Sequence, residues 1–243
     1  GMDVARINAS HGTHEEHLVR INRVREIANA YGKYVGIMLD LAGPKIRTGK
    51  IKGGEVELAE GSVLSLIPGN KEGDESRVYI NHPDFLEYII PGSKIFLNDG
   101  LVELVAEEVG EEEAKCRVAT KGILGSRKGV SIPGARAGSV GATRKDLKDI
   151  KFAAKMEVDF IAASFIQHAD DVVRIKALLD AERSDAFIIG KIESSEGVGN
   201  IESILRVADG ITVARGDLGI EMPAEQVPLL QKKIIRNCNT TGK

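Results

Sequence analysis

Two opposite charges, two residues apart, end an apolar run in this sequence. Phe187, Ile188 and Ile189 suit a strand that is buried on both faces, and Lys191 and Glu193 follow at once. In an extended chain the side chains at i and i+2 point to the same face, so this strand would direct an ammonium and a carboxylate to one spot. A metal-bound carboxylate and an ammonium can share one anionic ligand, and a simple ion pair is the alternative interpretation.

A second carboxylate, Asp217, follows a later apolar run within the Gly-rich sequence ARGDLG. Two carboxylates leave much of a coordination shell open to water and to substrate oxygens, which suits Mg²⁺. Glu193 and Asp217 are therefore the candidate metal ligands, and the alternative is that they are exposed loop charges. Gly216 and Gly219 would allow backbone N–H groups to approach a carboxylate or phosphate, although Gly-rich turns are common.

Composition narrows the classes of protein to consider. The chain has 243 residues, of which 42% are hydrophobic and 28% are charged, so it can bury a sizeable core. A net charge of −3 gives no indication of nucleic-acid or membrane binding. No apolar run approaches the ~20 residues that span a bilayer. Two thiols, Cys116 and Cys238, in a sequence without a signal peptide favour a cytoplasmic location.

Alternating strands and helices are predicted to position the charged residues. Thr13 and Glu16 form a capping box before a helix whose apolar face is Leu18, Ile21, Val24, Ile27 and Tyr31. Strands are predicted at 2–8, 34–39, 158–164, 187–193 and 209–219, with further helices at 147–156, 170–182 and 200–208 and after Pro223. Thr143 and Asp146 begin the second helix. This alternation indicates an α/β fold with a parallel sheet.

A different pattern interrupts the alternation between the second and third strands. From about residue 51, short alternating segments are separated by Gly, Asn-Asp-Gly and Pro-Gly, as in a small antiparallel β domain. This pattern continues to GVSIPGARAGSVG (129–141). The chain therefore divides into residues 1–45, an inserted β domain at 46–140, and residues 141–243.

Polar side chains follow every predicted strand of the parallel sheet, at the edge where ligands bind in such folds. They are Arg6, Asn8 and Ser10, then Asp40, then Ser164, then Lys191 and Glu193, and finally Arg215 and Asp217. The basic turn GSRKG (125–129) in the β domain is either a solvated loop or a phosphate contact. The phosphate-binding patterns G-x-x-x-x-G-K-[ST] and G-x-G-x-x-G do not occur, and HEEHL (14–18) lacks the spacing of a zinc helix.

Seven motifs, in order, resemble those of the pyruvate kinase family. They are GMDVARINASHG, DLAGPKIRTG, GSRKGVSIPG, DFIAASFI, KIESSEG, DGITVARGDLGIEMP and QKKIIRNCNTTGK, which together extend over essentially the whole chain. The resemblance implies a (β/α)₈ TIM-type barrel, incomplete here, with an inserted small antiparallel β-barrel domain that acts as a lid. It also implies transfer of a phosphoryl group from phosphoenolpyruvate to ADP, which gives pyruvate and ATP in glycolysis.

The resemblance also assigns roles to individual residues. It implies that the carboxylates of Glu193 and Asp217 bind Mg²⁺ or Mn²⁺, and that Lys191 and Arg6 are catalytic. The same two cations would bind substrate together with Ser164, Gly216 and Asp217, and the nucleotide-binding residues would be Arg47, Lys128 and Asn8. The parent enzyme would be a cytoplasmic homotetramer that binds neither nucleic acid nor membrane. Charge neutralisation and positioning suit phosphoryl transfer.

One departure from the family pattern concerns the monovalent cation. Many members bind K⁺ at positions that match Asn8, Ser10, Asp40 and the residue after Asp40, and they carry Thr at that last position and Glu in GPEIR. Here these two residues are Leu41 and Lys45. A tethered ammonium can replace a monovalent cation, so we expect that K⁺ is not required.

A second departure is length, because five strand–helix units are predicted where the family has eight. We therefore expect a fragment of a longer enzyme with little turnover by itself, and two unpaired sheet edges. One alternative is another Mg²⁺-dependent barrel that acts on a related acid, such as an aldolase or lyase. The inserted β domain and GPKIRTG argue against it. The other alternative is a non-enzyme that retains metal or nucleotide binding.

Overall fold

The structure, a computed structural model, describes residues 1–133 and 142–243, which form two compact units. Unit 1 consists of Gly1–Pro44, Ser139–Arg215 and Pro228–Lys243, and unit 2 of Lys45–Gly138 and Gly216–Val227. The sequence-based division did not assign 216–227 to the β domain. Within unit 2 the Ser131 hydroxyl donates to Glu221 Oε1 at 2.7 Å, which ties this segment to the β strands.

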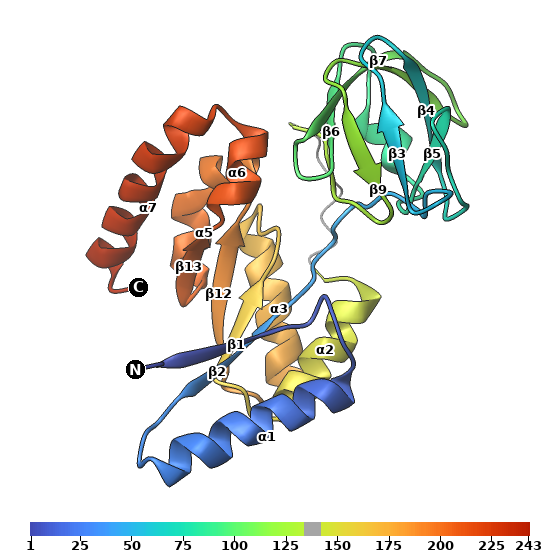
Figure 1. Cartoon of the computed structure of the whole chain (residues 1–243). Helices are drawn as coiled ribbons and strands as arrows, with labels where there is room; N and C mark the ends of the chain where they lie inside the picture. Colours follow the sequence, from blue (N-terminus) through green and yellow to red (C-terminus); the bar gives the residue numbers. More distant parts are fainter. Residues whose placement is uncertain (134–141) are drawn as a thin grey trace. The chain divides into compact units, whose positions relative to one another are not determined.

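Unit 1 contains a five-stranded, wholly parallel sheet (Figure 1). Its order is β1 (Val4–Asn8), β2 (Gly36–Asp40), β11 (Phe160–Ala163), β12 (Phe187–Ile192) and β13 (Gly210–Val213). Neighbouring strands pair in parallel throughout, as the alternation predicted. The carboxyl ends of all five strands therefore lie along one edge, where the polar side chains follow.

Helices connect these strands, and local capping determines where two of them begin. Thr13 forms the predicted capping box with Glu16, and Thr143, which was predicted to begin a helix, forms one with Asp146. Pro228 is the second residue of the last helix, where a missing N–H costs no helical hydrogen bond. The helices are α1 (His14–Ala30), α2 (Arg144–Lys155), α3 (Ala169–Ala181), α4 (Ser195–Gly199), α5 (Ile201–Val207), α6 (Arg215–Glu221) and α7 (Val227–Thr241), with a 3₁₀ turn at Ala224–Gln226.

Two helical segments differ from the sequence prediction. Residues 215–219 were assigned to the exit of the last strand, but β13 ends at Val213 and α6 begins at Arg215. The short helix α4 was not predicted, and the side chain of Ser194 caps it by accepting from the Gly197 N–H at 3.2 Å. In both places Gly residues concealed the helix, because glycine is normally unfavourable inside one.

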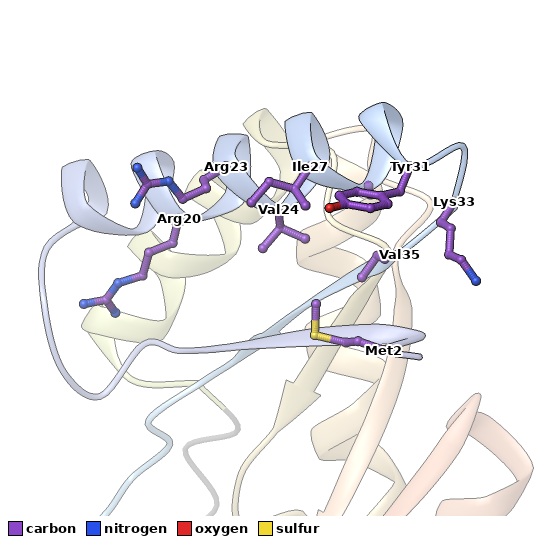
Figure 2. Close-up of a pocket in the computed structure, with 9 residues that line it drawn as sticks. Met2, Arg20, Arg23, Val24, Ile27, Tyr31, Lys33 and Val35 are labelled. Carbon is purple, nitrogen blue, oxygen red and sulfur yellow. The ribbon is translucent and has the colours of Figure 1, made fainter.

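The predicted apolar face of α1 is only partly buried. His17 and Ile21 are its buried residues, whereas Ile27 is 51% exposed and Tyr31 78% exposed. Figure 2 shows that Val24, Ile27 and Tyr31 instead face Met2 and Val35 across an open groove of about 420 Å³. Helical periodicity identifies the face of α1, but the side chains packed against it decide how much of it is buried.

His17 is 1% exposed, and within the described residues its Nδ1 has no hydrogen-bond partner. Burial lowers the pKa of this imidazole because the charged form would lose its hydration. Of the charged neighbours, three lower the pKa further and one raises it: Arg20, His14 and Lys145 act in the first sense and Asp149 in the second. His17 is therefore held neutral in the folded chain.

Replacing His17 with leucine is expected to reduce the loss of unfolding free energy as the pH falls. In the unfolded chain His17 takes up a proton as the pH falls below about 6.5, while the folded chain resists protonation, so stability is lost on acidification. Urea unfolding at about pH 7, 6 and 5 measures this slope. His11→Gln, at an exposed position, is the control. Identical slopes for the two variants would contradict the prediction.

The described part of unit 2 before residue 134 contains eight strands and one 3₁₀ turn (Figure 1), and residues 216–227 add most of α6 and the 3₁₀ turn at Ala224–Gln226. A six-stranded sheet has the order β10-β6-β7-β8-β4-β5, and β3 pairs with β9. The elements are β3 (Glu55–Leu58), β4 (Val63–Pro68), β5 (Arg77–Ile80), the 3₁₀ turn Phe85–Tyr88, β6 (Lys94–Leu97), β7 (Val102–Val109), β8 (Ala114–Val118), β9 (Gly122–Gly125) and β10 (Val130–Ser131).

One pair in this sheet is not antiparallel, contrary to the sequence prediction. β4 and β5 pair in parallel, from Ser65 opposite Arg77 to Pro68 opposite Ile80. The connection between them doubles back, and the Gly73 N–H donates to the Lys50 carbonyl at 2.8 Å on its way. Alternation of side chains along short segments predicts strands, but it does not distinguish parallel from antiparallel pairing. The end of the predicted β domain, at 134–141, lies outside the described residues.

The two cysteines are free thiols in different surroundings. Cys116 is fully buried in the core of unit 2, and burial raises its pKa to about 12, with Glu107 adding to the effect. Because the thiolate is the reactive form, Ellman's reagent is expected to label Cys238 in the folded chain and Cys116 only after denaturation. Cys238→Ser should abolish the native labelling. Rapid labelling of both thiols before unfolding would contradict this.

Across residues 1–133 and 142–243, none of the helices combines the length and the apolar character needed to cross a bilayer.

Candidate active site

The ammonium of Lys191 is the centre of the polar cluster at the carboxyl edge of unit 1. It donates to Ser164 Oγ at 2.8 Å. It also forms ion pairs with Glu193 Oε1 at 3.1 Å and with Asp40 Oδ1 at 3.2 Å, and its side chain is 15% exposed. Three strands, β2, β11 and β12, supply these groups. The contact between Lys191 and Glu193 follows from the alternation of side chains along an extended chain.

Lys191 remains charged in this setting. Burial by itself would lower the pKa of Lys191, but the charges of Glu193 and Asp40 outweigh it, so the pKa lies above its ordinary value. A compact ammonium between two carboxylates leaves a net negative charge of one for this trio. The Arg6 guanidinium, which contacts Asp40, balances that charge, and the Lys191 ammonium suits a nearby anion.

The carboxylate of Glu193 is buried and is held from two sides. Its residue is 4% exposed, Oε1 faces Lys191, and Oε2 accepts a hydrogen bond from the backbone N–H of Phe165 at 2.8 Å. Carboxylate oxygens are the ligands that Mg²⁺ and Mn²⁺ prefer, so this donor fits a hard divalent ion. Sequence reasoning missed Phe165, because a contact made by a backbone N–H leaves no mark on residue type.

Asp40 is the second buried carboxylate of the cluster. The Nε of Arg6 donates to Asp40 Oδ2 at 2.7 Å, and the guanidinium also contacts that oxygen through Nη2. The Arg6 side chain is nevertheless 60% exposed, so part of its fork can meet an anion. The sequence predicted Arg6 and Asp40 as separate site residues, and it gave no indication that they pair.

Asn8 is the last residue of β1, and Ser10 lies in the turn that follows it. Asn8 Oδ1 accepts from the Ser10 N–H at 2.9 Å, and Asn8 is in register with Asp40 of β2. Leu41, the residue after Asp40, is 3% exposed. Its carbonyl accepts from the Ser164 hydroxyl at 2.8 Å. The residues predicted to surround a monovalent cation thus belong to the exits of the two neighbouring strands β1 and β2.

The remaining site residues belong to unit 2. Lys45 Nζ lies 3.5 Å from Asp217 Oδ1, and both side chains are about one-third exposed. Arg47 Nη1 donates to the Arg127 carbonyl at 3.3 Å. The Lys128 carbonyl accepts from the Thr48 N–H at 2.8 Å, and Lys128 itself is half-buried. The side chains of Lys45 and Arg47 therefore lie beside the turn at 127–129, which carries Lys128.

Gly216 and Asp217 form part of the first turn of α6. A Cβ added at Gly216 would meet no atom within 4 Å, so the space beside this backbone is open. Of the two predicted metal ligands, Glu193 belongs to unit 1 and Asp217 to unit 2. In the described residues, no three His, Cys, Asp or Glu side chains gather as a metal cluster.

The structure thus gathers the predicted residues into two groups. Unit 1 brings together Arg6, Asn8, Ser10, Asp40, Ser164, Lys191 and Glu193, and unit 2 contains Lys45, Arg47, Lys128, Gly216 and Asp217. The fold and the first group define an α/β protein with buried charges at the carboxyl edge of a parallel sheet. Comparison with known proteins identifies the family.

The chain belongs to the pyruvate kinase family, because the family described as "Pyruvate kinase, barrel domain" matches residues 1–243. The chain is 43% identical over 245 aligned residues to a pyruvate kinase of Staphylococcus aureus (strain MRSA252). It is 44% identical over the same length to a pyruvate kinase of Staphylococcus epidermidis (strain RP62A). Each alignment covers all of this chain and 42% of the relative, so the chain spans less than half of their length.

Proposed function

We propose that the chain is part of a pyruvate kinase, which transfers a phosphoryl group from phosphoenolpyruvate to ADP to give pyruvate and ATP. The observation that carries the proposal is the charged Lys191 ammonium, buried with Ser164, Asp40 and Glu193 at the ligand-binding edge of a parallel sheet. Phosphoryl transfer depends on positioning and on neutralising charge, which such a cluster provides.

In this proposal the cations of unit 1 stabilise the anionic groups of the reaction. The Lys191 ammonium neutralises the phosphoryl group in transfer and the enolate oxygen that emerges as the phosphate leaves. The exposed part of the Arg6 guanidinium binds the phosphoryl oxygens, and the Asp40 carboxylate orients that guanidinium by accepting its hydrogen bond. Ser164 holds the Lys191 ammonium and contributes to substrate binding.

The proposed ligands of a divalent ion are Glu193 and Asp217, with Mg²⁺ as the metal and Mn²⁺ as its substitute. When bound, the ion supplies further positive charge for substrate and phosphate oxygens. The buried Glu193 carboxylate fits this role because Phe165 and Lys191 fix both of its oxygens. The backbone of Gly216 and Asp217 is proposed to receive the substrate carboxylate, since the space beside Gly216 is open.

The basic side chains of unit 2 are proposed to bind the nucleotide. Arg47 and Lys128 would contact its phosphates, with Asn8 contributing from unit 1, and the turn at 125–129 then has the phosphate-binding role that the sequence left open. We further propose that unit 1 is part of a (β/α)₈ barrel and that unit 2 is its inserted β domain. The whole enzyme would be a cytoplasmic homotetramer without nucleic-acid or membrane partners.

Calorimetry with Mg²⁺ and oxalate, a mimic of the enolate, tests the site on the chain itself. We expect oxalate to bind only when Mg²⁺ is present, and we expect Glu193→Gln and Asp217→Asn each to abolish that binding. Glu202→Gln, at an exposed position of unit 1, is the matched control. Oxalate binding that persists in both site variants would refute the assignment. Formation of pyruvate that requires ADP, measured in an enzyme containing this chain, tests the reaction.

A further inference from the structure

Phe165 adopts a backbone conformation that is unfavourable for its residue type. Its φ is +56°, in the left-handed region that glycine and asparagine tolerate and other residues avoid. Six described residues other than glycine have positive φ, and Phe165 is the one that lies at the carboxyl edge of the parallel sheet. Such a conformation persists only where the surrounding structure imposes it.

Ser164 restrains Phe165 on one side. Its hydroxyl donates to the Leu41 carbonyl at 2.8 Å and accepts from Lys191 Nζ at 2.8 Å. Gly43 packs against Ser164 so closely that a Cβ added to Gly43 would lie 2.7 Å from Ser164 Cβ. The exit of β2 therefore holds the residue before Phe165 in one place.

Ile166 restrains Phe165 on the other side. The Ile166 N–H donates to the Lys191 carbonyl at 3.2 Å, and Ile166 is 1% exposed. A Cβ added at Gly197 would lie 2.6 Å from the Ile166 carbonyl oxygen, so α4 allows this backbone no movement toward it. With both neighbours fixed, the chain can pass through position 165 only with the left-handed conformation.

The strained backbone directs a hydrogen-bond donor at Glu193. The Phe165 N–H lies 2.8 Å from Glu193 Oε2, while Lys191 occupies Oε1 at 3.1 Å. We propose that Phe165 is a positioning residue that acts through its backbone conformation: it fixes the orientation of the Glu193 carboxylate and thereby the affinity for a divalent ion. The effect on metal affinity rests on the proposed function of Glu193 as a metal ligand.

This role predicts a ranking of variants at position 165 that differs from the ranking expected from side-chain size. If the backbone conformation matters, glycine and asparagine at position 165 preserve it, whereas β-branched valine opposes it. If the phenyl ring matters instead, valine should be the best substitute and glycine the worst. The ranking of the three variants therefore separates the two explanations.

The first readout is the Mn²⁺ dissociation constant of the 243-residue chain, measured by titration with Mn²⁺ and electron paramagnetic resonance. We expect Phe165→Gly and Phe165→Asn to keep the Mn²⁺ dissociation constant within about threefold, and Phe165→Val to weaken it about tenfold. Arg183→Val is the matched control, because Arg183 has the same φ of +56° in unit 1 and has no contact with Glu193 among those described. A size-ordered ranking, or equal affinities for Val and Asn, would overturn the proposal.

The amide proton of residue 165 gives a second readout that needs no metal. In the wild-type chain we expect this amide to be shifted downfield and protected from hydrogen exchange, because it donates to a buried carboxylate. Phe165→Gly should retain both properties, while Phe165→Val and Glu193→Ala, which lacks the acceptor, should lose them. If the wild-type chain bound no Mn²⁺, the proposed metal site would fail, and this measurement would still decide the role of Phe165. Rapid exchange of this amide in the wild type would overturn it.

Discussion

Replacing Lys191 with methionine is expected to lower the free energy of unfolding by about 3–5 kcal/mol, the usual cost of removing one partner from a buried ion pair. The loss arises because Asp40 and Glu193, which are 2% and 4% exposed, would then face each other with only Arg6 to balance them. Urea unfolding of the 243-residue chain measures the change. A loss below about 1 kcal/mol, the range of a surface pair, would contradict the prediction.

Lys176→Met is the matched control, since Lys176 pairs with Asp180 at 3.4 Å on the exposed face of α3. It should cost less than about 1 kcal/mol, because solvent screens that pair. Adding Glu193→Gln to Lys191→Met should recover part of the loss, because it removes one of the two negative charges that Lys191 balanced. Mg²⁺ should also raise the stability of Lys191→Met, since an ion that binds only the folded chain stabilises it.

Lys45→Glu is expected to make ligand binding depend on K⁺. Lys45 Nζ lies 3.5 Å from Asp217 Oδ1, so the substitution replaces an attraction with a repulsion at a proposed metal ligand. The lost attraction and the new repulsion are each worth about 1 kcal/mol at this partial exposure. We therefore expect Mg²⁺-dependent oxalate binding to weaken at least about tenfold without K⁺. About 0.1 M K⁺ should restore it by supplying the missing positive charge.

The wild-type chain should bind oxalate equally well, within about twofold, in K⁺ and in tetramethylammonium buffers, because we propose that the Lys45 ammonium supplies the charge that K⁺ would supply. Lys94→Glu is the control, since it makes the same charge change in unit 2 at a residue paired with Glu103. If K⁺ strongly increased the oxalate affinity of the wild-type chain, the prediction would be contradicted. A Lys45→Glu variant that binds oxalate as tightly without K⁺ as with it would also contradict the prediction.

Local sequence patterns predicted the five strands of the parallel sheet and most helices, but not α4 or α6. The capping boxes at Thr13 and Thr143, the apolar runs of the five strands, and the change of pattern near residue 51 all lie within a few neighbouring residues. The positions of Lys191 and Glu193 on one side of β12 also followed from the sequence, because side-chain alternation is a property of any extended chain.

Other features depended on residues far apart in the chain. The parallel pairing of β4 with β5, the exposure of Tyr31 on α1 and the union of 216–227 with unit 2 are each decided by what packs against the segment. Local propensity cannot anticipate such contacts, since the same segment can satisfy its hydrogen bonds in more than one way.

For the candidate site, the sequence by itself determined which residue types follow each strand, and therefore which charges reach the carboxyl edge. Only the tertiary structure decided that Asp40 is shared by Arg6 and Lys191, and that the Phe165 N–H meets Glu193. The physical reason is that alternation and capping are short-range properties of the chain. The orientation of a buried carboxylate is instead set by donors from several strands at once, including a backbone N–H whose direction depends on a strained φ.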